Sequence, residues 1–262
     1  MEPGSSPLPI DSKTRFSSRV EDYVRYRPRY PMACHDFLRD ELGIGVRSVV
    51  ADVGSGTGIF VEPLLMAGAT VFGVEPNAEM RGAAEQLLAC YPHFHSVNGA
   101  AEATTLPDRS ADLVSCAQAF HWFDQPRAAA EFQRIAKPGG AVAVVWNQRR
   151  TTAAGFLAEY ESLLVTYGTD YQNVAREHRP MTEADFSGLF GVPFRRVVFP
   201  NFQSLDVAGL RGRVLSASYT PAPGQPGHFE LMAALTPLFD RHQVNGQVTI
   251  PYDTEMYVGR FA

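Results

Sequence analysis

The chain has 262 residues, of which 45% are hydrophobic and 19% are charged, so it is long enough to bury a large core and too apolar to be disordered as a whole. Its 23 lysines and arginines against 28 aspartates and glutamates leave a formal charge of -5, which gives no electrostatic reason to expect a nucleic-acid or membrane partner. No apolar run approaches the roughly 18 to 20 residues of a membrane span, and the N-terminus lacks the apolar core of a signal peptide. Cys34, Cys90 and Cys116 are dispersed, which predicts reduced, buried side chains in a cytoplasmic protein.

The first 15 residues are rich in Pro, Ser and Gly and predict a mobile arm, followed by one domain over residues 16–262. Strands are predicted where short runs are nearly continuous in apolar residues, at 48–54, 69–75, 93–98, 111–117 and 141–147. Amphipathic segments between them, at 59–67, 78–90 and 126–136, predict helices, with Asn77 and Asp124 as N-caps. This alternation predicts an α/β fold with a doubly wound, Rossmann-like and mostly parallel sheet covered by helices on both faces.

After Asn147 the alternation ends, and the pattern predicts a mostly helical insertion. Helices are expected at 153–168, 183–190, 208–218 and 229–242, and two further strands at 194–199 and 248–261 bring the sheet to seven. We therefore expect a ligand-binding core over 46–147 and an insertion over 148–245 that forms a lid on the substrate side.

The strongest local signal is the segment ADVGSGTGIF at 51–60, which follows a predicted strand and precedes a predicted helix. Gly54, Gly56 and Gly58 allow the backbone to turn sharply and to pass close to a ligand. Their G-x-G-x-G spacing differs from the G-x-G-x-x-G of dinucleotide-binding folds. Asp52 would repel a pyrophosphate and instead suits a ligand that carries an ammonium group or hydroxyls.

A second acidic residue, Glu75, ends the second predicted strand. A carboxylate at this position can accept hydrogen bonds from both hydroxyls of a ribose, as in other doubly wound nucleoside-binding folds. Together with Asp52 and the glycines, Glu75 predicts a site for an adenosine that carries a cationic amino-acid tail.

With these motifs, residues 46–147 resemble the class I S-adenosylmethionine-dependent methyltransferases, of methyltransferase type 11. The resemblance implies S-adenosylmethionine as cofactor, S-adenosylhomocysteine as product, and Met80 as an apolar contact to adenine. The segment NGAAEATTLPDRSADLV resembles the one that reads the adenine edge, and because Ala100 replaces the usual Asp, main-chain contacts from Ala101 and Glu102 are expected. The remaining cofactor-binding residues implied by the resemblance are Asp52, Gly54, Ser55, Gly56, Gly58, Glu75, Pro76, Ala117 and Gln118.

Two further segments, CAQAFHWFD at 116–124 and FSSRVEDYVRYRPRYP at 16–31, are similar to the trans-aconitate-methyltransferase-like group of small-molecule methyltransferases. In that group an N-terminal tyrosine and arginine fold over the cofactor. The resemblance places these roles on Tyr23 and Arg27.

Candidate acceptor residues follow the fourth strand and lie in the insertion, because ligands bind outside the carboxyl ends of parallel strands. His121 is a candidate general base, with a packed histidine as the alternative, and Trp122 is a candidate pocket wall. Among insertion residues, Tyr219 is a candidate acceptor contact, and an acidic acceptor could be held by Arg149 or by Arg150, Arg211 or Arg213. The aromatic residues Phe120, Trp122, Phe123 and Tyr219 favour a neutral or heteroaromatic acceptor.

The expected function is methyl transfer to an oxygen, nitrogen or carbon atom of a small molecule by in-line displacement, in a monomer or homodimer without a metal. No Cys or His cluster has metal-ligand spacing. The alternative is a protein of the same fold that binds the cofactor without transferring its methyl group, as a rearrangement catalyst or a sensor. A nicotinamide-dependent oxidoreductase is disfavoured by the glycine spacing and by Asp52.

Overall fold

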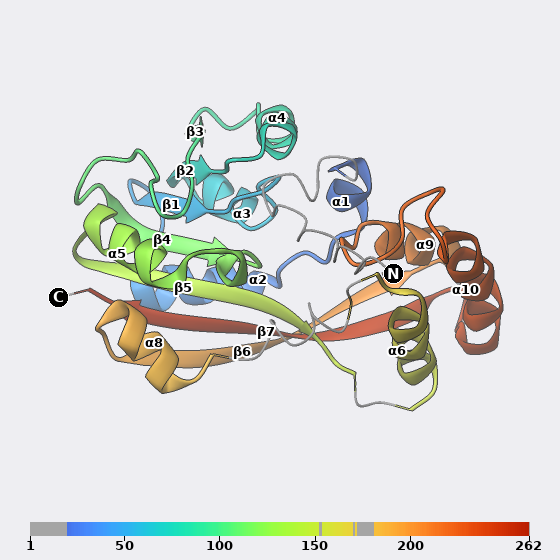
Figure 1. Cartoon of the computed structure of the whole chain (residues 1–262). Helices are drawn as coiled ribbons and strands as arrows, with labels where there is room; N and C mark the ends of the chain where they lie inside the picture. Colours follow the sequence, from blue (N-terminus) through green and yellow to red (C-terminus); the bar gives the residue numbers. More distant parts are fainter. Residues whose placement is uncertain (1–19, 152–153, 170, 172–180, 262) are drawn as a thin grey trace, which may run out of the picture.

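A seven-stranded, mostly parallel sheet forms the centre of the protein, as predicted (Figure 1). The computed structural model describes residues 20–151, 154–169, 171 and 181–261, and the predicted arm at 1–15 lies outside them. The strands run in the order β3-β2-β1-β4-β5-β7-β6, and β7 is antiparallel to both of its neighbours. Their bounds are β1 (Val49–Val53), β2 (Thr70–Val74), β3 (Phe94–Val97), β4 (Ala111–Ala117), β5 (Ala136–Arg149), β6 (Phe194–Leu205) and β7 (Val248–Arg260).

Helices pack on both faces of this sheet. On one face, α5 (Gln125–Ile135) and α8 (Glu183–Phe190) bury Phe132 and Phe186 in the core. On the other face, α2 (Met32–Leu42) and α3 (Glu62–Met66) bury Leu38 and Leu64. The helix α4 (Ala78–Leu87) lies beside β3 at the edge of the sheet. The strands β1, β2 and β4 are thereby packed against an apolar core on each face.

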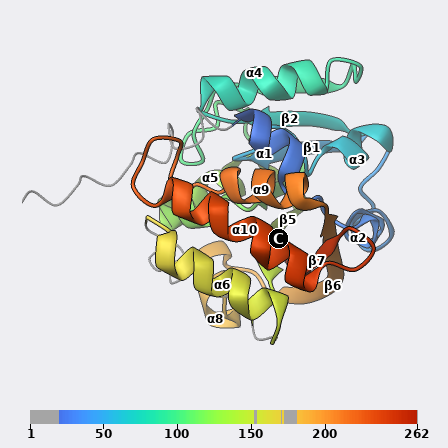
Figure 2. The ribbon, with the colours of Figure 1, turned by 90° about the vertical axis from the view of Figure 1, so that its right-hand side faces the viewer.

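A second helical group surrounds the far end of the long β6–β7 ribbon (Figures 1 and 2). It consists of α6 (Phe156–Tyr167), α9 (Val207–Leu215) and α10 (His228–His242), which share a separate apolar cluster with Leu205, Ile250 and Tyr252. The short helix α1 (Val20–Tyr26) rests on α9. The insertion therefore has two parts. Helix α8 packs on the sheet, whereas α6, α9 and α10 form a separate cluster at the end of the ribbon.

Several elements differ from the sequence-based expectation. The helix predicted at 59–67 begins only at Glu62, because Gly56 and Gly58 have positive φ and the chain continues in turns after them. Strand β6 extends to Leu205 instead of 199, since it pairs along the whole of β7. Helix α2 was not predicted, and Cys90 is exposed whereas the other two cysteines are buried. No helix in the described part of the chain is long and apolar enough to cross a membrane.

Candidate functional site

Two adjoining cavities open at the carboxyl ends of the parallel strands. One, the β2-side cavity, has residues that follow β2 and β3 in its lining, and the other, the insertion-side cavity, reaches towards α9. The β2-side cavity contains about 810 Å³ of empty space and the insertion-side cavity about 850 Å³, including the solvent at their openings. The residues that line both are Tyr23, Gly54, Ala117, Gln118 and Trp122. A ligand longer than either cavity can therefore lie across the two.

Glu75 projects into the β2-side cavity directly after β2. The backbone N–H of Gly56 donates to its Oε2 at 3.0 Å, and that of Asn77 donates to its Oε1 at 2.9 Å. Burial raises the pKa of Glu75, while these two N–H groups act in the opposite direction. The carboxylate is thus fixed in position with acceptor capacity left on both oxygens.

The three glycines of the 51–60 loop are each required for a different structural reason. Gly56 lines the β2-side cavity at φ +55°, and a Cβ there would lie 3.4 Å from the Met80 methyl carbon. Gly54 lines both cavities, but a Cβ on it would collide with the Ala119 side chain at 2.6 Å. Gly58 lines neither cavity, contrary to its expected cofactor contact. It is required because its φ is +81° and a Cβ would approach Leu88 to 2.5 Å.

Asp52, near the end of β1, lines the insertion-side cavity with only 1% of its surface exposed. The Ser115 hydroxyl on neighbouring β4 donates to its Oδ1 at 2.6 Å. Burial raises the pKa of Asp52 to about 7, and the negative charge of Glu75 adds to the rise, whereas the hydrogen bond from Ser115 opposes it. A cationic ligand group beside Asp52 would favour its ionised form.

The segment after β3 forms a further wall of the β2-side cavity. Pro76, Ala101 and Glu102, which were expected to contact the cofactor, line this cavity, and Met80 lines it from the first turn of α4, which Asn77 caps. The Glu102 side chain also accepts the backbone N–H of Asp124 and thereby ties the wall to the start of α5.

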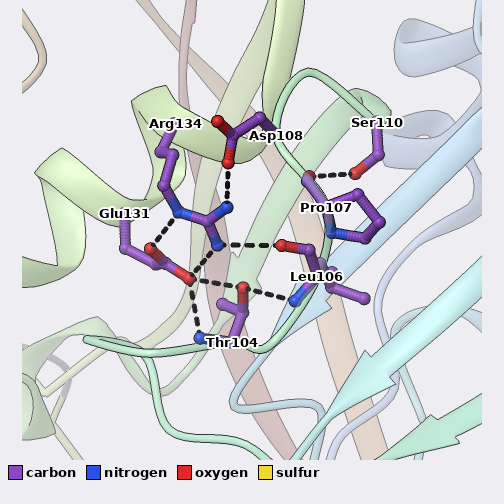
Figure 3. A network of polar contacts seen from close by, with 7 residues as sticks. All are labelled: Thr104, Leu106, Pro107, Asp108, Ser110, Glu131 and Arg134. Carbon is purple, nitrogen blue, oxygen red and sulfur yellow. Dashed lines mark hydrogen bonds and ion pairs between the residues drawn. The ribbon is translucent and has the colours of Figure 1, made fainter.

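A polar network joins the segment that follows this wall, residues 104–110, to helix α5 (Figure 3). The Glu131 side chain, 9% exposed, accepts from the backbone N–H of Thr104 at 2.7 Å and from its hydroxyl at 2.6 Å. Arg134 donates to both Glu131 oxygens, to the Leu106 carbonyl and to Asp108. The Arg134 hydrogen bonds, aided by those from Thr104, lower the pKa of Glu131 to about 2. The network was not predicted, because its residues are far apart in the sequence.

The end of β4 supplies the floor where the two cavities meet. Gln118 has φ +58°, which is uncommon for a residue with a side chain, and its amide donates to the Asn147 carbonyl at 3.2 Å. His121 and Trp122 follow in a 3-10 turn, with ring centroids 4.7 Å apart, and both line the insertion-side cavity. His121 is therefore a cavity residue, whereas Asp124 caps α5 as predicted.

Helix α1 and the segment after it cover the cavities from above. Tyr23 lines both cavities, and the Arg27 guanidinium lies 4.8 Å from the centre of the Tyr23 ring. Arg27 also donates to the Ser216 carbonyl at 2.9 Å, which links α1 to the loop after α9. Burial lowers the pKa of Arg27, and the nearby Arg213 charge adds to that effect.

The four arginines that were candidates to hold the acceptor differ in whether they line a cavity. Arg149, expected to contact the acceptor, lies outside the lining of both cavities because it pairs with Glu161 on α6 and donates to the Tyr171 hydroxyl at 2.7 Å. Arg150 pairs with Asp253, and Arg211 is exposed and donates to Thr236. Only Arg213 of these four lines a cavity, together with Tyr219.

The aromatic wall also differs from the expectation. Phe120 is completely buried in the core, and Phe123 lines only the β2-side cavity. Residues that sequence reasoning did not select line the insertion-side cavity, namely Pro28, Tyr30, Thr57, Ile59, Phe60, Asn147 and Ser218. The signal for Tyr30 was present in the RYRPRYP segment, which was assigned only through Arg27. Within the described residues, no group of three or more His, Cys, Asp or Glu side chains is placed to hold a metal.

Comparisons with known proteins find similarity over the part of the chain that contains these strand ends. Residues 51–144 match the family model described as a methyltransferase domain. The chain is 35% identical over 162 residues to an uncharacterised methyltransferase-like protein of Schizosaccharomyces pombe, which covers 62% of this chain and 61% of that protein. It is 40% identical over 139 residues to an uncharacterised methyltransferase of Mycobacterium tuberculosis, covering 53% and 54% of the two chains.

Solved structures show the same fold at low identity. A protein of Anaeromyxobacter dehalogenans, provisionally named a type II methyltransferase, superposes with a TM-score of 0.61 at 24% identity, over 90% of this chain and 98% of that one. The phosphoethanolamine N-methyltransferase 2 of Haemonchus contortus, solved with phosphomonomethylethanolamine and S-adenosylhomocysteine, gives a TM-score of 0.57 at 12% identity, over 96% of this chain and 59% of that one.

Residues 51–144 thus match a methyltransferase domain, and the sheet with its covering helices has the fold of solved methyltransferases. The match spans 61% of the yeast relative and 54% of the mycobacterial one. The finer likeness to the trans-aconitate-methyltransferase group stays a prediction.

Proposed function

We propose that this protein transfers a methyl group from S-adenosylmethionine to an oxygen, nitrogen or carbon atom of a small-molecule acceptor. The observation that carries the proposal is the position of Glu75. Each of its carboxylate oxygens accepts one backbone N–H, from Gly56 or Asn77. Since a carboxylate oxygen has about two acceptor sites, one site on each oxygen remains for the two hydroxyls of a ribose.

The surrounding residues suit the other parts of the cofactor. Met80, in the same cavity as Glu75, offers an apolar surface to adenine. In the insertion-side cavity, Asp52 offers a carboxylate to an ammonium group. Thr57 lies in the same lining, and its buried hydroxyl has no hydrogen-bond partner among the described residues, so it can donate to a carboxylate beside Arg27. These donors and acceptors match the ends of S-adenosylmethionine.

When bound, S-adenosylmethionine supplies a methyl group on a sulfonium, and an acceptor lone pair bonds to the methyl carbon while the carbon–sulfur electron pair returns to sulfur and leaves S-adenosylhomocysteine. The protein's own residues align the acceptor and exclude water. The part of the insertion-side cavity near His121 and Tyr219 is left for the acceptor. His121 would take the proton from a hydroxyl or amine acceptor, whereas an ionised carboxylate acceptor needs no base.

The test has two steps. Calorimetry with S-adenosylmethionine and S-adenosylhomocysteine measures binding, and chromatography of S-adenosylhomocysteine formed with a small-molecule cell extract measures turnover. Extract-dependent formation of S-adenosylhomocysteine together with a methylated product supports the proposal. Tight binding without extract-dependent turnover supports the non-transferring alternative, and absence of binding by the folded protein contradicts both.

A further inference from the structure

A buried cation on α9 faces the insertion-side cavity without an acidic partner. Arg213 is 5% exposed, and its Nε donates to the Tyr252 hydroxyl at 3.3 Å. Its Nη1 is buried and has no hydrogen-bond partner among the described residues. Nor does any carboxylate in the described part of the chain form an ion pair with it, although its guanidinium lies in the lining of the cavity.

Other arginines near the β6–β7 ribbon are paired, both the half-buried Arg149 and the exposed Arg196. Arg149 forms an ion pair with Glu161, and Arg196 forms one with Glu255 at 2.6 Å. A buried charge without a counterion is costly, and a protein retains one mainly where a ligand completes it. Because Arg213 lacks such a carboxylate among the described residues, we expect an anionic group of a ligand to pair with it in the cavity.

The charges around the insertion-side cavity also favour two anionic groups. Its charged lining consists of Arg27, Arg213 and Asp52, and burial raises the pKa of Asp52 to about 7. Under the proposed function one anion is the carboxylate of the cofactor, which suits Arg27 because its guanidinium stacks on Tyr23, a residue shared by both cavities. Arg213 stands on the insertion side beside Ser218 and Tyr219 and is left for the second anion.

We propose that Arg213 is the acceptor's anion receptor, so that the acceptor is a small organic molecule bearing a carboxylate or phosphate group. The inference rests on the proposed function and adds the substrate class to it. A guanidinium presents parallel N–H groups that match either oxyanion, and the Tyr252 hydroxyl fixes its orientation from behind. The proposal replaces the expectation of a neutral acceptor, because Arg213 lines the cavity beside the aromatic residues and Phe120 is in the core.

The experiment compares Arg213→Gln and Arg213→Lys with a matched control, Arg211→Gln, two residues away on the same helix but exposed and outside both cavities. Transfer of labelled methyl groups is measured with a panel of small mono-, di- and tricarboxylic acids, the corresponding organic phosphates, and their uncharged amides and alcohols. In parallel, calorimetry measures S-adenosylmethionine affinity, and thermal shifts record binding of the same panel to protein loaded with S-adenosylhomocysteine. Urea denaturation checks that each variant is folded.

We expect the wild type and Arg211→Gln to bind and methylate anionic panel members in preference to uncharged ones. Arg213→Gln should raise the KM for the preferred anion by about 10- to 100-fold, and Arg213→Lys by less, with S-adenosylmethionine affinity changed less than threefold. Comparison of the carboxylic acids with the organic phosphates in the panel identifies which oxyanion is bound.

Three results would overturn the assignment. They are a preference of the wild type for uncharged compounds, the same anion binding in the loaded Arg213→Gln protein, and a loss of cofactor affinity as large as the rise in KM. Failure of the wild type to bind S-adenosylmethionine is a different result, because it removes the proposed function itself.

Discussion

Replacing Asp52 with Asn should make the ligand-free protein more stable and the cofactor complex weaker. The pKa of Asp52 is raised from 3.8 to about 7 because the carboxylate is buried, so ionising it costs the folded state free energy that the unfolded state does not lose. A rise of about 3 pKa units corresponds to about 4 kcal/mol at pH 8 and to less than half of that at pH 5.

The contribution of Asp52 to stability changes with pH in the direction opposite to that of an ordinary salt-bridged aspartate. Because the folded-state pKa of Asp52 is raised, its contribution to stability is complete below pH 3.8 and is lost as the pH rises to about 7. Asp52→Asn has no such loss, and its side chain can still accept the hydrogen bond from Ser115. In urea denaturation without ligand, the variant should gain up to about 4 kcal/mol over the wild type at pH 8 and clearly less at pH 5.

Calorimetry on the same pair tests the functional side. Under the proposed function the ammonium group of S-adenosylmethionine binds the ionised form of Asp52, so wild-type affinity should fall about tenfold for each pH unit below 7, and Asp52→Asn should bind weakly at every pH. Ser115→Ala removes the hydrogen bond that opposes the rise in pKa and should shift the wild-type pH dependence upward. A variant Asp52→Asn that is less stable than the wild type at pH 8 and binds with an unchanged pH profile would refute this reasoning.

Other parts of the site make further predictions. Glu75→Ala should weaken S-adenosylmethionine binding by roughly 1.5 to 3 kcal/mol in calorimetry, whereas the exposed Glu79→Ala should not, and equal losses would contradict the ribose assignment. Gly56→Val should abolish cofactor binding because of φ +55° at the cavity wall, and normal binding by that variant would make the loop merely structural. The free energy of unfolding should fall by up to about 3 kcal/mol as the pH drops from about 4.5 to 2, since the pKa of Glu131 is about 2, and Arg134→Met should flatten this part of the pH curve in urea denaturation. His121→Ala should lower kcat by about 10²-fold in steady-state assays if the acceptor loses a proton, and an unchanged pH–rate profile would exclude it as the base.

The sequence predicted the sheet and the position of Asp52 and Glu75 on neighbouring parallel strands, because both depend on local patterns. Continuous apolar runs mark strands buried on two faces, and residues at successive strand ends, such as Asp52 and Glu75, must meet at one edge. The N-caps at Asn77 and Asp124 were predicted for the same reason, since a cap depends on neighbouring residues.

The acceptor side could not be predicted in this way, because it depends on contacts between distant segments. Arg149 and Arg213 are equally plausible in the sequence, and only the position of Glu161 on α6 removes the first from the cavity. Phe120 and Trp122 differ by two positions in one short turn, yet the first enters the core and the second the cavity. The polar network between residues 104–110 and α5 likewise joins residues from separate elements.

The most direct test of the account is a crystal structure with S-adenosylhomocysteine bound. We predict that the ligand lies across both cavities, with its ribose hydroxyls on Glu75, its amino group beside Asp52, and its sulfur facing the part of the insertion-side cavity that holds His121 and Arg213. A ligand bound elsewhere, or one whose ribose does not contact Glu75, would contradict it.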